Sequence, residues 1–561
     1  MTMLDAVVFI GTLILVLLYG MWKGRGHHDT DAYLRANRSL PWYMVLLGVM
    51  ATQASAITFL SAPGQAYTDG MRFVQYYFGL PLAMIVISAV FIPIFRRQNV
   101  YTAYEYLEHR FDRRTRVTTS ILFLLSRGIS TGISIYAPSI IVSTVLGWNI
   151  YITNVLVGGL LLVYTLRGGA RAVAHTQTVM FTIIMTVMAL SVYFLLDHLP
   201  PDITFLDAVT IAGKSGALNV ITTDIDLNDR YNLFSGVVGG FFLALSYFGT
   251  DQSQVGRFIT GKGIEQSRKG MLWNGIVKVP MQFAILFIGA LLVALYSVLP
   301  GPLFFNHHVA EQVRQDAPAQ AKDLEERWMM AQNTLSAAAH ELAVDVDDGV
   351  LQSDVESSFQ DASSKAKEIR EEYRSLVKST GIAESSDANY VFLHFVRTVL
   401  PVGIVGLVFA VIIMASWGSI SAALHSLATA SYVDLKRRTE DGGRRTDSVA
   451  AARWHTAGWG VFGIAISMAA TRMGSLIEAV NILGSLFYGP ILGIFLVAFF
   501  VKRATGSHVF VAAIIAEAVV FSCWAFDVVS FLWLNVVGSG VVVLLATVAS
   551  WYQPSRNQYS S

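Results

Sequence analysis

The amino-acid sequence predicts an all-α protein that crosses a membrane about thirteen times. Of its 561 residues, 54% are hydrophobic and only 14% are charged, which is far from the composition of soluble globular proteins. The apolar residues gather in runs of about 18 or more, the length that an α-helix needs to cross a bilayer. Connections rich in Lys and Arg alternate with connections that lack them, a pattern typical of multi-pass membrane proteins.

Thirteen apolar runs are long enough to span the membrane. They lie at 4–22, 42–62, 74–95, 117–146, 148–165, 172–196, 233–250, 270–298, 402–434, 454–471, 476–500, 507–526 and 529–551. The first run is followed by Lys23 and Arg25 and lacks a small-residue cleavage site. We therefore interpret it as a retained helix and not as a signal peptide.

The basic connections predict the orientation in the membrane. All of them fall on one side if the N-terminus lies outside, namely 23–38, 96–116, 167–171, 257–269, 436–445 and 502–503. An even number of helices would break this alternation. We expect a multi-pass protein of the cell inner (plasma) membrane with its N-terminus outside and its C-terminus in the cytoplasm.

The sequence lacks the residues that several kinds of site require. Cys523 is the single cysteine, which excludes an intrachain disulfide or a thiolate metal cluster. The twelve histidines show no HExxH spacing, and no glycine loop of the phosphate-binding type is present. We expect no enzyme activity and no nucleic-acid partner.

The stretch 45–64 carries polar groups that a lipid-facing helix would not need. Thr52, Ser55, Thr58 and Ser61 recur every third residue and place hydroxyls along one helical face, and Pro63 and Gly64 are expected to close the segment. Such a stripe suits a helix that opens its backbone in the membrane, where freed carbonyls can face an ion. The alternative is that these hydroxyls bond back to their own helix.

A second stripe of small and hydroxyl-bearing residues runs along 402–434. Small residues allow two helix backbones to approach closely, and hydroxyls supply neutral oxygens of the kind that a hard monovalent cation prefers. Together the two stripes favour an ion site, although ordinary small-residue packing remains an alternative. The second stripe consists of Ala415, Gly418, Ser419, Ala422, Ser426 and Thr429.

The segment 303–390 does not fit a bare helix bundle. It contains 17 Asp and Glu residues against 8 Lys and Arg residues. The runs 321–342 and 353–378 have helix-forming composition, which predicts two antiparallel helices on the outer surface. A solvated spacer without function of its own is equally compatible with this composition, so we expect the insert to be dispensable for the main activity; its partner is unknown.

Six segments make the sequence similar to the sodium/solute symporter family, which includes carriers of sugars, proline, sialic acid and iodide. The resemblance covers most of the chain apart from the insert and the last two helices. It rests on ATQASAITFLSAPG at 51–64, YTAYEYLEHRF at 101–111, RGGARAVAHTQ at 167–177, YFGTDQSQVGRF at 247–258, LPVGIVGLVFAVIIMAS at 400–416 and the SLATASYVDL run that ends at Leu435.

The resemblance implies a LeuT-like fold, in which two inverted repeats of five helices contain the broken helices. The first repeat would occupy 41–198, and the second would occupy 233–302 and 391–500. An extra N-terminal helix with its loop (1–40), an external loop (199–232), the insert (303–390) and two further helices with a short tail (501–561) would surround this core.

The resemblance also implies a sodium site with few ligands. The carbonyls of Ala51, Ala54 and Ala415 would bind the ion, together with side chains at the positions of Gly418 and Ser419. Relatives carry two adjacent hydroxyls at this pair, whereas here only Ser419 has one. Gln177 stands where some relatives have an aspartate for a second sodium, so we expect one co-transported Na+.

The solute pocket should lie beside the ion, between the two broken helices. Lys278 is the most informative candidate, because a cation inside a spanning helix is costly and usually functional. It could bond a sugar hydroxyl, bind a solute carboxylate or pair with Asp251. By the same resemblance the substrate-binding groups are Gln53, Thr58, Gln75, Tyr76, Tyr247, Gln252, Lys278 and Asn481.

These features predict a sodium-driven importer of a small polar organic solute, such as a sugar, a sugar acid or another organic acid, that works by alternating access. The rival is a membrane sensor with a transporter-like core, although only about ten residues follow the last apolar run. A membrane enzyme is a weaker alternative, because no metal-ligand cluster or nucleophile–base pair is evident.

Overall fold

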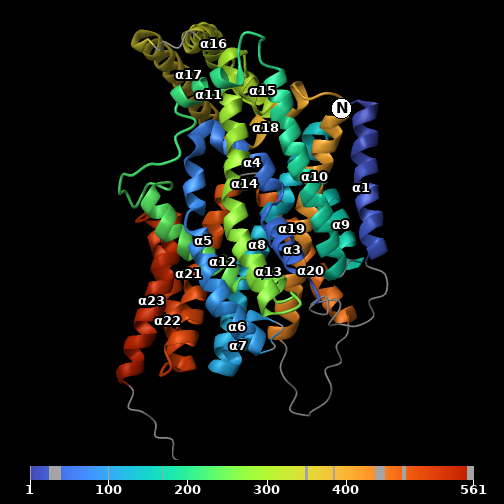
Figure 1. Cartoon of the computed structure of the whole chain (residues 1–561), viewed down its shortest axis with the longest axis vertical. Coiled ribbons are helices and arrows are strands. Elements are labelled where there is room, and N and C mark those ends of the chain that lie inside the picture. Colours follow the sequence, from blue (N-terminus) through green and yellow to red (C-terminus); the bar gives the residue numbers. More distant parts are fainter. Residues whose placement is uncertain are drawn as a thin grey trace, which may run out of the picture.

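The computed structural model confirms the all-α fold class and the distribution of spanning helices. It describes residues 2–23, 39–98, 100, 102–167, 170–347, 352–382, 386–435, 449–470 and 476–552. Within these ranges the chain is almost entirely helical (Figure 1), and a single β-bridge joins Leu40 to Gly261.

The bounds of the described helices follow in chain order. The first half contains α1 (Met3–Lys23), α3 (Trp42–Gln53), α4 (Ala56–Asp69), η2 (Gly70–Tyr77), α5 (Leu80–Val86), η3 (Ile87–Phe91), α6 (Ile92–Arg97), α7 (Ala103–Arg110), α8 (Arg113–Leu146), α9 (Ile150–Arg167), α10 (Ala170–Asp197) and α11 (Phe205–Lys214). The second half contains η4 (Ser235–Gly239), α12 (Gly240–Thr250), α13 (Gln252–Phe258), α14 (Ile264–Val298), α15 (His307–Asp316), α16 (Pro318–Asp347), α17 (Ser353–Ser379), α18 (Ala388–Thr398), α19 (Ile404–Asp434), α20 (Val449–Ala469), α21 (Leu476–Phe500), α22 (Gly506–Ala525) and α23 (Phe531–Tyr552).

Helix ends follow the local sequence. Asp112 caps α8 by accepting a hydrogen bond from the Thr115 amide at 2.8 Å, and Thr102 caps α7 by accepting one from the Glu105 amide at 3.2 Å.

The predicted apolar runs agree with the observed helices to within a few residues over most of the chain. In the described ranges, nine helices are long and apolar enough to cross a membrane, and three shorter apolar helices accompany them. The total of thirteen spans stays a prediction.

Two spanning segments are interrupted, as the sequence led us to expect. The first interruption separates α3 from α4 at Ala54 and Ser55, and the second separates α12 from α13 at Asp251. Our expectation that Pro63 and Gly64 end the first segment is wrong, because both lie inside α4. Gly64 serves packing instead: a Cβ there would lie 1.7 Å from the carbonyl oxygen of Ala388 in α18.

The insert forms a small helical layer on one end of the molecule (Figure 1). Its helices α16 and α17 pack against each other as predicted, and α15 is an additional helix. The insert is bonded to the body: Gln332 donates to the Tyr296 carbonyl at 2.5 Å, and Lys367 donates to the Ser215 carbonyl at 2.7 Å. These bonds attach the insert to the body, while its role stays a prediction.

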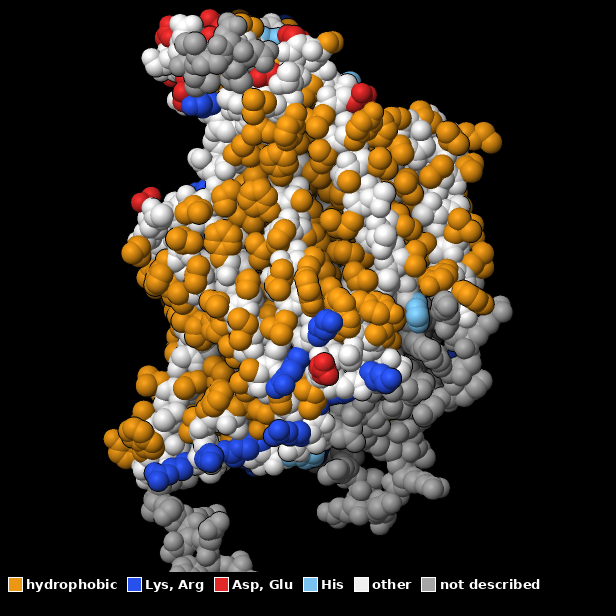
Figure 2. Space-filling view, in the orientation of Figure 1, with side chains coloured by type: hydrophobic (Ala, Val, Ile, Leu, Met, Phe, Trp, Pro, Cys, Tyr) orange, Lys and Arg blue, Asp and Glu red, His pale blue; other side chains and the backbone are white. Residues whose placement is uncertain are grey.

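The surface is divided as in a membrane protein. Figure 2 shows a broad hydrophobic band below the insert and a row of Lys and Arg side chains along the opposite edge. The N-terminus lies at the same end as the insert, as the alternation of basic connections predicts (Figure 1). The protein is therefore a multi-pass membrane protein, while the side on which each terminus lies stays a prediction.

Candidate functional site

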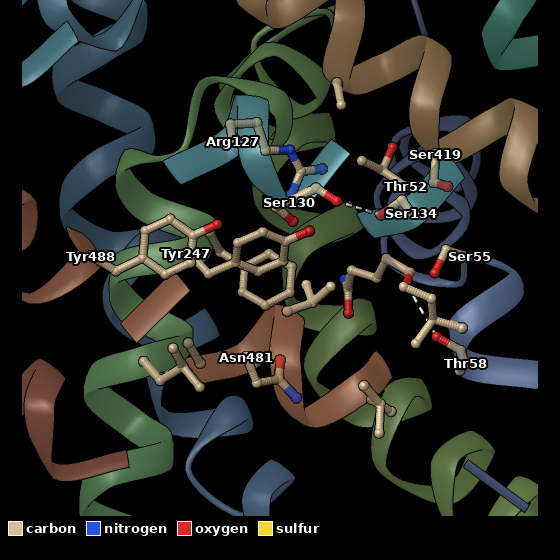
Figure 3. Close-up of a pocket in the computed structure, with 18 of the residues that line it drawn as sticks. Thr52, Ser55, Thr58, Arg127, Ser130, Ser134, Tyr247, Ser419, Asn481 and Tyr488 are labelled. Carbon is tan, nitrogen blue, oxygen red and sulfur yellow. Dashed lines mark hydrogen bonds between the residues drawn. The ribbon is translucent and has the colours of Figure 1, made fainter. Parts of the chain in front are cut away.

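A cavity of about 130 Å³ lies between the two interrupted helices. Its walls come from α3 and α4, η2, α5, α8, α12, α14, α19 and α21, so both halves of the chain contribute. In Figure 3, Tyr247 and Tyr488 lie on one side of the cavity, and Ser55, Thr58 and Ser419 lie on the other. None of the residues that line it is Asp or Glu.

The first interruption leaves backbone oxygens without partners. The Ala54 amide bonds to the Met50 carbonyl at 2.8 Å, and the Ser55 amide turns back to the Gln53 carbonyl at 2.9 Å. Among the described residues, none donates a hydrogen bond to the carbonyls of Ala51, Thr52 or Ala54. Unpaired carbonyls inside a membrane protein are costly unless they face water or a cation, so this arrangement fits a cation site.

Helix α19 brings one hydroxyl of its stripe to the cavity. Ser419 lines the cavity, and its hydroxyl donates only a weak bond to the Ser416 carbonyl at 3.2 Å. Ser426 and Thr429 bond instead to carbonyls four residues earlier in their own helix, at 2.8 and 2.7 Å. All three hydroxyls thus bond back to their own helix, and of the three only Ser419 lines the cavity.

Gln177 is already engaged with the backbone of α19. Its amide Nε2 donates to the Gly418 carbonyl at 3.0 Å, and its Oε1 is buried without a hydrogen-bond partner in the described ranges. A Cβ at Gly418 would lie 3.3 Å from the Gln177 Cγ, which is tighter than most contacts. The glutamine thus fills the space beside Gly418 and brings no charge.

The carboxylate at the second interruption is fully satisfied. Asp251 accepts hydrogen bonds from the Ser253 amide at 2.7 Å and the Tyr488 hydroxyl at 3.0 Å. Arg127 of α8 supplies the positive charge, with its Nη1 at 4.0 Å from Asp251 Oδ2. Because Asp251 pairs with Arg127, it is not the partner of Lys278.

Lys278 lines the cavity without an acidic neighbour. The side chain is 1% exposed, and the ammonium lies 5.4 Å from the ring centre of Tyr77. Within the described ranges, no carboxylate oxygen lies within 4.0 Å of its Nζ. The ring face offers weak cation–π attraction and leaves the charge without an anion.

The structure brings most of the proposed solute-binding residues together. Gln53, Thr58, Tyr76, Tyr247, Lys278 and Asn481 all line the cavity. The Tyr76 hydroxyl donates to Asn481 Oδ1 at 3.1 Å, and Gln53 Nε2 lies 3.4 Å from Asn274 Oδ1.

Gln75 and Gln252 lie outside the cavity, contrary to our expectation. Gln75 is fully buried and donates to the Tyr231 carbonyl at 2.7 Å, which holds the loop before η4. Gln252 accepts from the Ala103 amide at 2.9 Å and thereby holds the start of α7. Both amides bind backbone groups more than a hundred residues away, which a local pattern does not show.

Four polar residues that we did not predict also line the cavity, namely Arg127, Ser130, Ser134 and Tyr488. Arg127 is 8% exposed, and its Nε has no hydrogen-bond partner among the described residues. A signal was present: an arginine lies inside the apolar run 117–146, and the reasoning that selected Lys278 applies equally to it.

Comparisons with known proteins agree with this architecture. The sequence profile of the sodium:solute symporter family matches residues 33–315 and 371–516. The sodium-coupled monocarboxylate transporter 1 of Mus musculus is 32% identical over 266 residues, covering 46% of this chain and 42% of that protein. The sodium/sialic acid symporter NanT of Aliivibrio fischeri is 22% identical over 560 residues, covering 97% of this chain and 92% of that protein.

A solved structure extends the comparison to the fold. It is the substrate-bound outward-open state of a Na+-coupled sialic acid symporter, which is 20% identical and superimposes with a TM-score of 0.75 over 99% of this chain and 98% of that chain. The chain spans only 66%, 42% and 42% of the length of three of the curated relatives that it matches. The fold is therefore LeuT-like, and this chain is a member of the sodium:solute symporter family.

Proposed function

We propose that the protein is a sodium-coupled symporter that imports a small organic solute bearing a carboxylate. One observation carries the choice of solute: Lys278 is buried in the cavity wall, and no carboxylate of the described residues lies within 4.0 Å of it. A buried cation without a counter-ion is unfavourable, and a solute carboxylate would supply the missing charge.

The rest of the cavity suits the remainder of such a solute. Asn481, Ser130 and Ser134 offer amide and hydroxyl groups, and Tyr77 and Tyr247 offer ring faces. A hydroxy acid or a sugar acid would use both kinds of group. A neutral sugar would leave the Lys278 charge unbalanced, so the cavity favours acids over neutral sugars.

Two relatives support an acidic solute. Their names assign a monocarboxylate to one protein and sialic acid to the other.

Sodium would act through the first interruption. An ion held by the carbonyls of Ala51, Thr52 and Ala54 and by the Ser419 hydroxyl would fix the backbone from which Gln53, Ser55 and Thr58 project into the cavity. Ion and solute then stabilise the same conformation, so each raises the affinity for the other. This reciprocal coupling lets the sodium gradient drive uptake.

Uptake by proteoliposomes tests the proposal. A neutral sugar and its corresponding sugar acid, together with a short monocarboxylate, would be compared with and without an inward sodium gradient. We expect sodium-dependent uptake of an acid and no competition by the neutral sugar. Equal competition by the neutral sugar would contradict the carboxylate assignment, and uptake indifferent to sodium would contradict the symport itself.

A further inference from the structure

A second cavity, of about 780 Å³, lies at the end of the molecule that carries the insert. Four elements wall it: the end of α8, the start of α9, the start of α15 and one face of α18. None of the central-cavity residues lines it, so it is a separate compartment.

The charge in this cavity is uniformly positive. Arg397 lines it from α18, is exposed, and has no carboxylate within 4.0 Å among the described residues. No residue that lines the cavity is Asp or Glu. A solvent-accessible guanidinium in a cavity without acids is a favourable partner for a planar oxyanion.

Two helices begin at this cavity and add to the positive potential. Asn149 caps the start of α9 by accepting from the Tyr151 amide at 2.9 Å, and Asn306 caps α15 by accepting from the His308 amide at 3.2 Å. The residues at both starts line the cavity, so the positive ends of both helix dipoles face it. The capping side chains use some of the backbone amide donors at these two helix starts, but the positive potential of the helix dipoles remains.

One histidine of the cavity, His394, supplies a hydrogen-bond donor without adding charge. His307 and His394 line the cavity with ring centres 5.7 Å apart. Burial, followed by the nearby His307 and Arg397, lowers the pKa of His394 to about 4. The ring of His394 is therefore neutral at pH 7 and is suited to donate a hydrogen bond to an anion held by Arg397.

We propose that this cavity binds a small oxyanion, a carboxylate or a phosphate, with Arg397 as its charged partner. The aromatic side chains of Tyr136, Trp148 and Tyr390 would contact the organic part of the ligand. Two sources offer this chemistry: an organic acid in the surrounding solution, or the phosphate of a lipid headgroup. The site goes beyond the proposed transport function and does not depend on it.

Thiol labelling measures the local potential directly. Thr398 lines the cavity and is exposed, so Thr398→Cys in a Cys523→Ser background places one reactive thiol there. Purified protein would be reacted with an anionic and a cationic methanethiosulfonate reagent. We expect Arg397→Gln to lower the anionic-to-cationic rate ratio about threefold or more. The matched control Arg314→Gln removes a charge that is already paired with Glu325 at 2.7 Å and should leave the ratio unchanged.

Protection of the same thiol identifies the source of the ligand. Protection by inorganic phosphate or lactate in detergent would support a soluble anion, and protection only in phosphatidylglycerol nanodiscs, not in phosphatidylcholine, would support a lipid. An unchanged rate ratio in Arg397→Gln, or an absence of protection in every arm, would overturn the proposal. If Thr398→Cys does not fold, Gln312→Cys provides a second exposed position on the cavity wall. Labelling requires no transport, so its failure leaves the proposed function untouched.

Discussion

At the scale of single residues, two buried cations in the central cavity differ in their balance of charge. Arg127 lies near Asp251, which the Tyr488 hydroxyl also contacts at 3.0 Å. Lys278 has no carboxylate of the described residues within 4.0 Å, and its ammonium lies 5.4 Å from the Tyr77 ring centre. The paired cation is suited to a structural role at the second interruption, and the unpaired one is suited to a ligand.

Lys278 should therefore affect solute affinity more than folding. Lys278→Ala is expected to raise the apparent KM for the acidic solute about tenfold or more, a loss of about 1.4 kcal/mol. Initial uptake rates over a range of solute concentrations would measure this. Lys269→Ala is the control, because that ammonium lies over the Trp42 ring at 4.5 Å and does not line the cavity. An unchanged KM in Lys278→Ala would remove this lysine from the solute site.

Ser419 should govern sodium activation. Ser419→Ala removes the only α19 hydroxyl that lines the cavity, so the sodium concentration for half-maximal uptake is expected to rise severalfold. Gln177→Ala should change it much less. Gly418→Ser would bring a Cβ to 3.3 Å from the Gln177 Cγ, so it gains a hydroxyl only if Gln177 shifts. Equal sodium curves for Ser419→Ala and the parent protein would place the ion elsewhere.

At the scale of elements, α4, the second half of the first broken helix, is joined closely to the insert. Arg370 of α17 lies 5.0 Å from the ring centres of both Tyr67 in α4 and Phe305. Asp387 is fully buried and accepts from Arg370 at 2.8 Å and from the Phe305 amide at 2.9 Å. Through these groups, α4, α18 and the insert form one packed unit.

Asp387 should make this unit sensitive to acid. Burial raises the pKa of its carboxyl, but Arg370, Arg374 and the Phe305 amide together lower it by more, so the net pKa lies below the ordinary 3.8. A carboxyl with a lowered pKa in the folded state stabilises it above about pH 4, and this stabilisation is lost as the pH falls through the folded-state value. Protease susceptibility of the insert between pH 6 and pH 3 is expected to rise at the acid end.

The variant Asp387→Asn tests the cause. It leaves the buried Arg370 without a carboxylate partner, whereas the partly buried Arg374 keeps Glu371. Breaking a buried ion pair typically costs about 3–5 kcal/mol, so the insert of this variant should be cleaved faster even at pH 6. Glu372→Gln is the control, because its partner Arg327 and Glu372 itself are each 40% exposed. Equal cleavage of Asp387→Asn and the parent protein would show that the buried ion pair contributes little.

The sequence predicted some features of these elements and missed others, and each outcome has a physical reason. The lengths of the apolar runs alone predicted where the spanning helices lie, because a helix needs a minimum number of apolar residues to cross a bilayer. The proline rule failed at Pro63, where packing of α4 against α18 keeps the helix intact. The composition of the insert predicted α16 and α17, but not that Arg370 packs over the Tyr67 ring of α4, since that contact joins residues far apart in the sequence.

At the scale of the whole molecule, the site was predictable where a single residue is unusual in its surroundings. Lys278 stood out as a cation in an apolar run, and its place in the cavity followed. Gln75 and Gln252 looked similar to the residues that do line the cavity, but long-range backbone bonds engage them. Only the folded chain shows which amides are already occupied.

The contacts of the insert also change what its removal should do. Replacing residues 303–390 by a Gly/Ser linker would remove Phe305, Arg370 and Asp387 from around Tyr67, so sodium-driven uptake is now expected to be lost. The double variant Met329→Ser, Met330→Ser should retain it, because these side chains are 65% and 63% exposed. Normal uptake by a correctly inserted linker variant would restore the interpretation of the insert as a spacer.

The central cavity has no acidic lining, and this has an electrical consequence. One sodium ion bound by neutral oxygens and one monocarboxylate bound by Lys278 carry opposite unit charges, so a complete cycle would move no net charge. We expect uptake that follows the sodium concentration gradient and produces no steady current across a solid-supported membrane. An imposed potassium diffusion potential should not alter the rate. An inward positive current would reveal a second sodium ion in each cycle, whereas voltage-independent uptake would mean that such a carrier works equally well in an energised cell and in one whose membrane potential has collapsed.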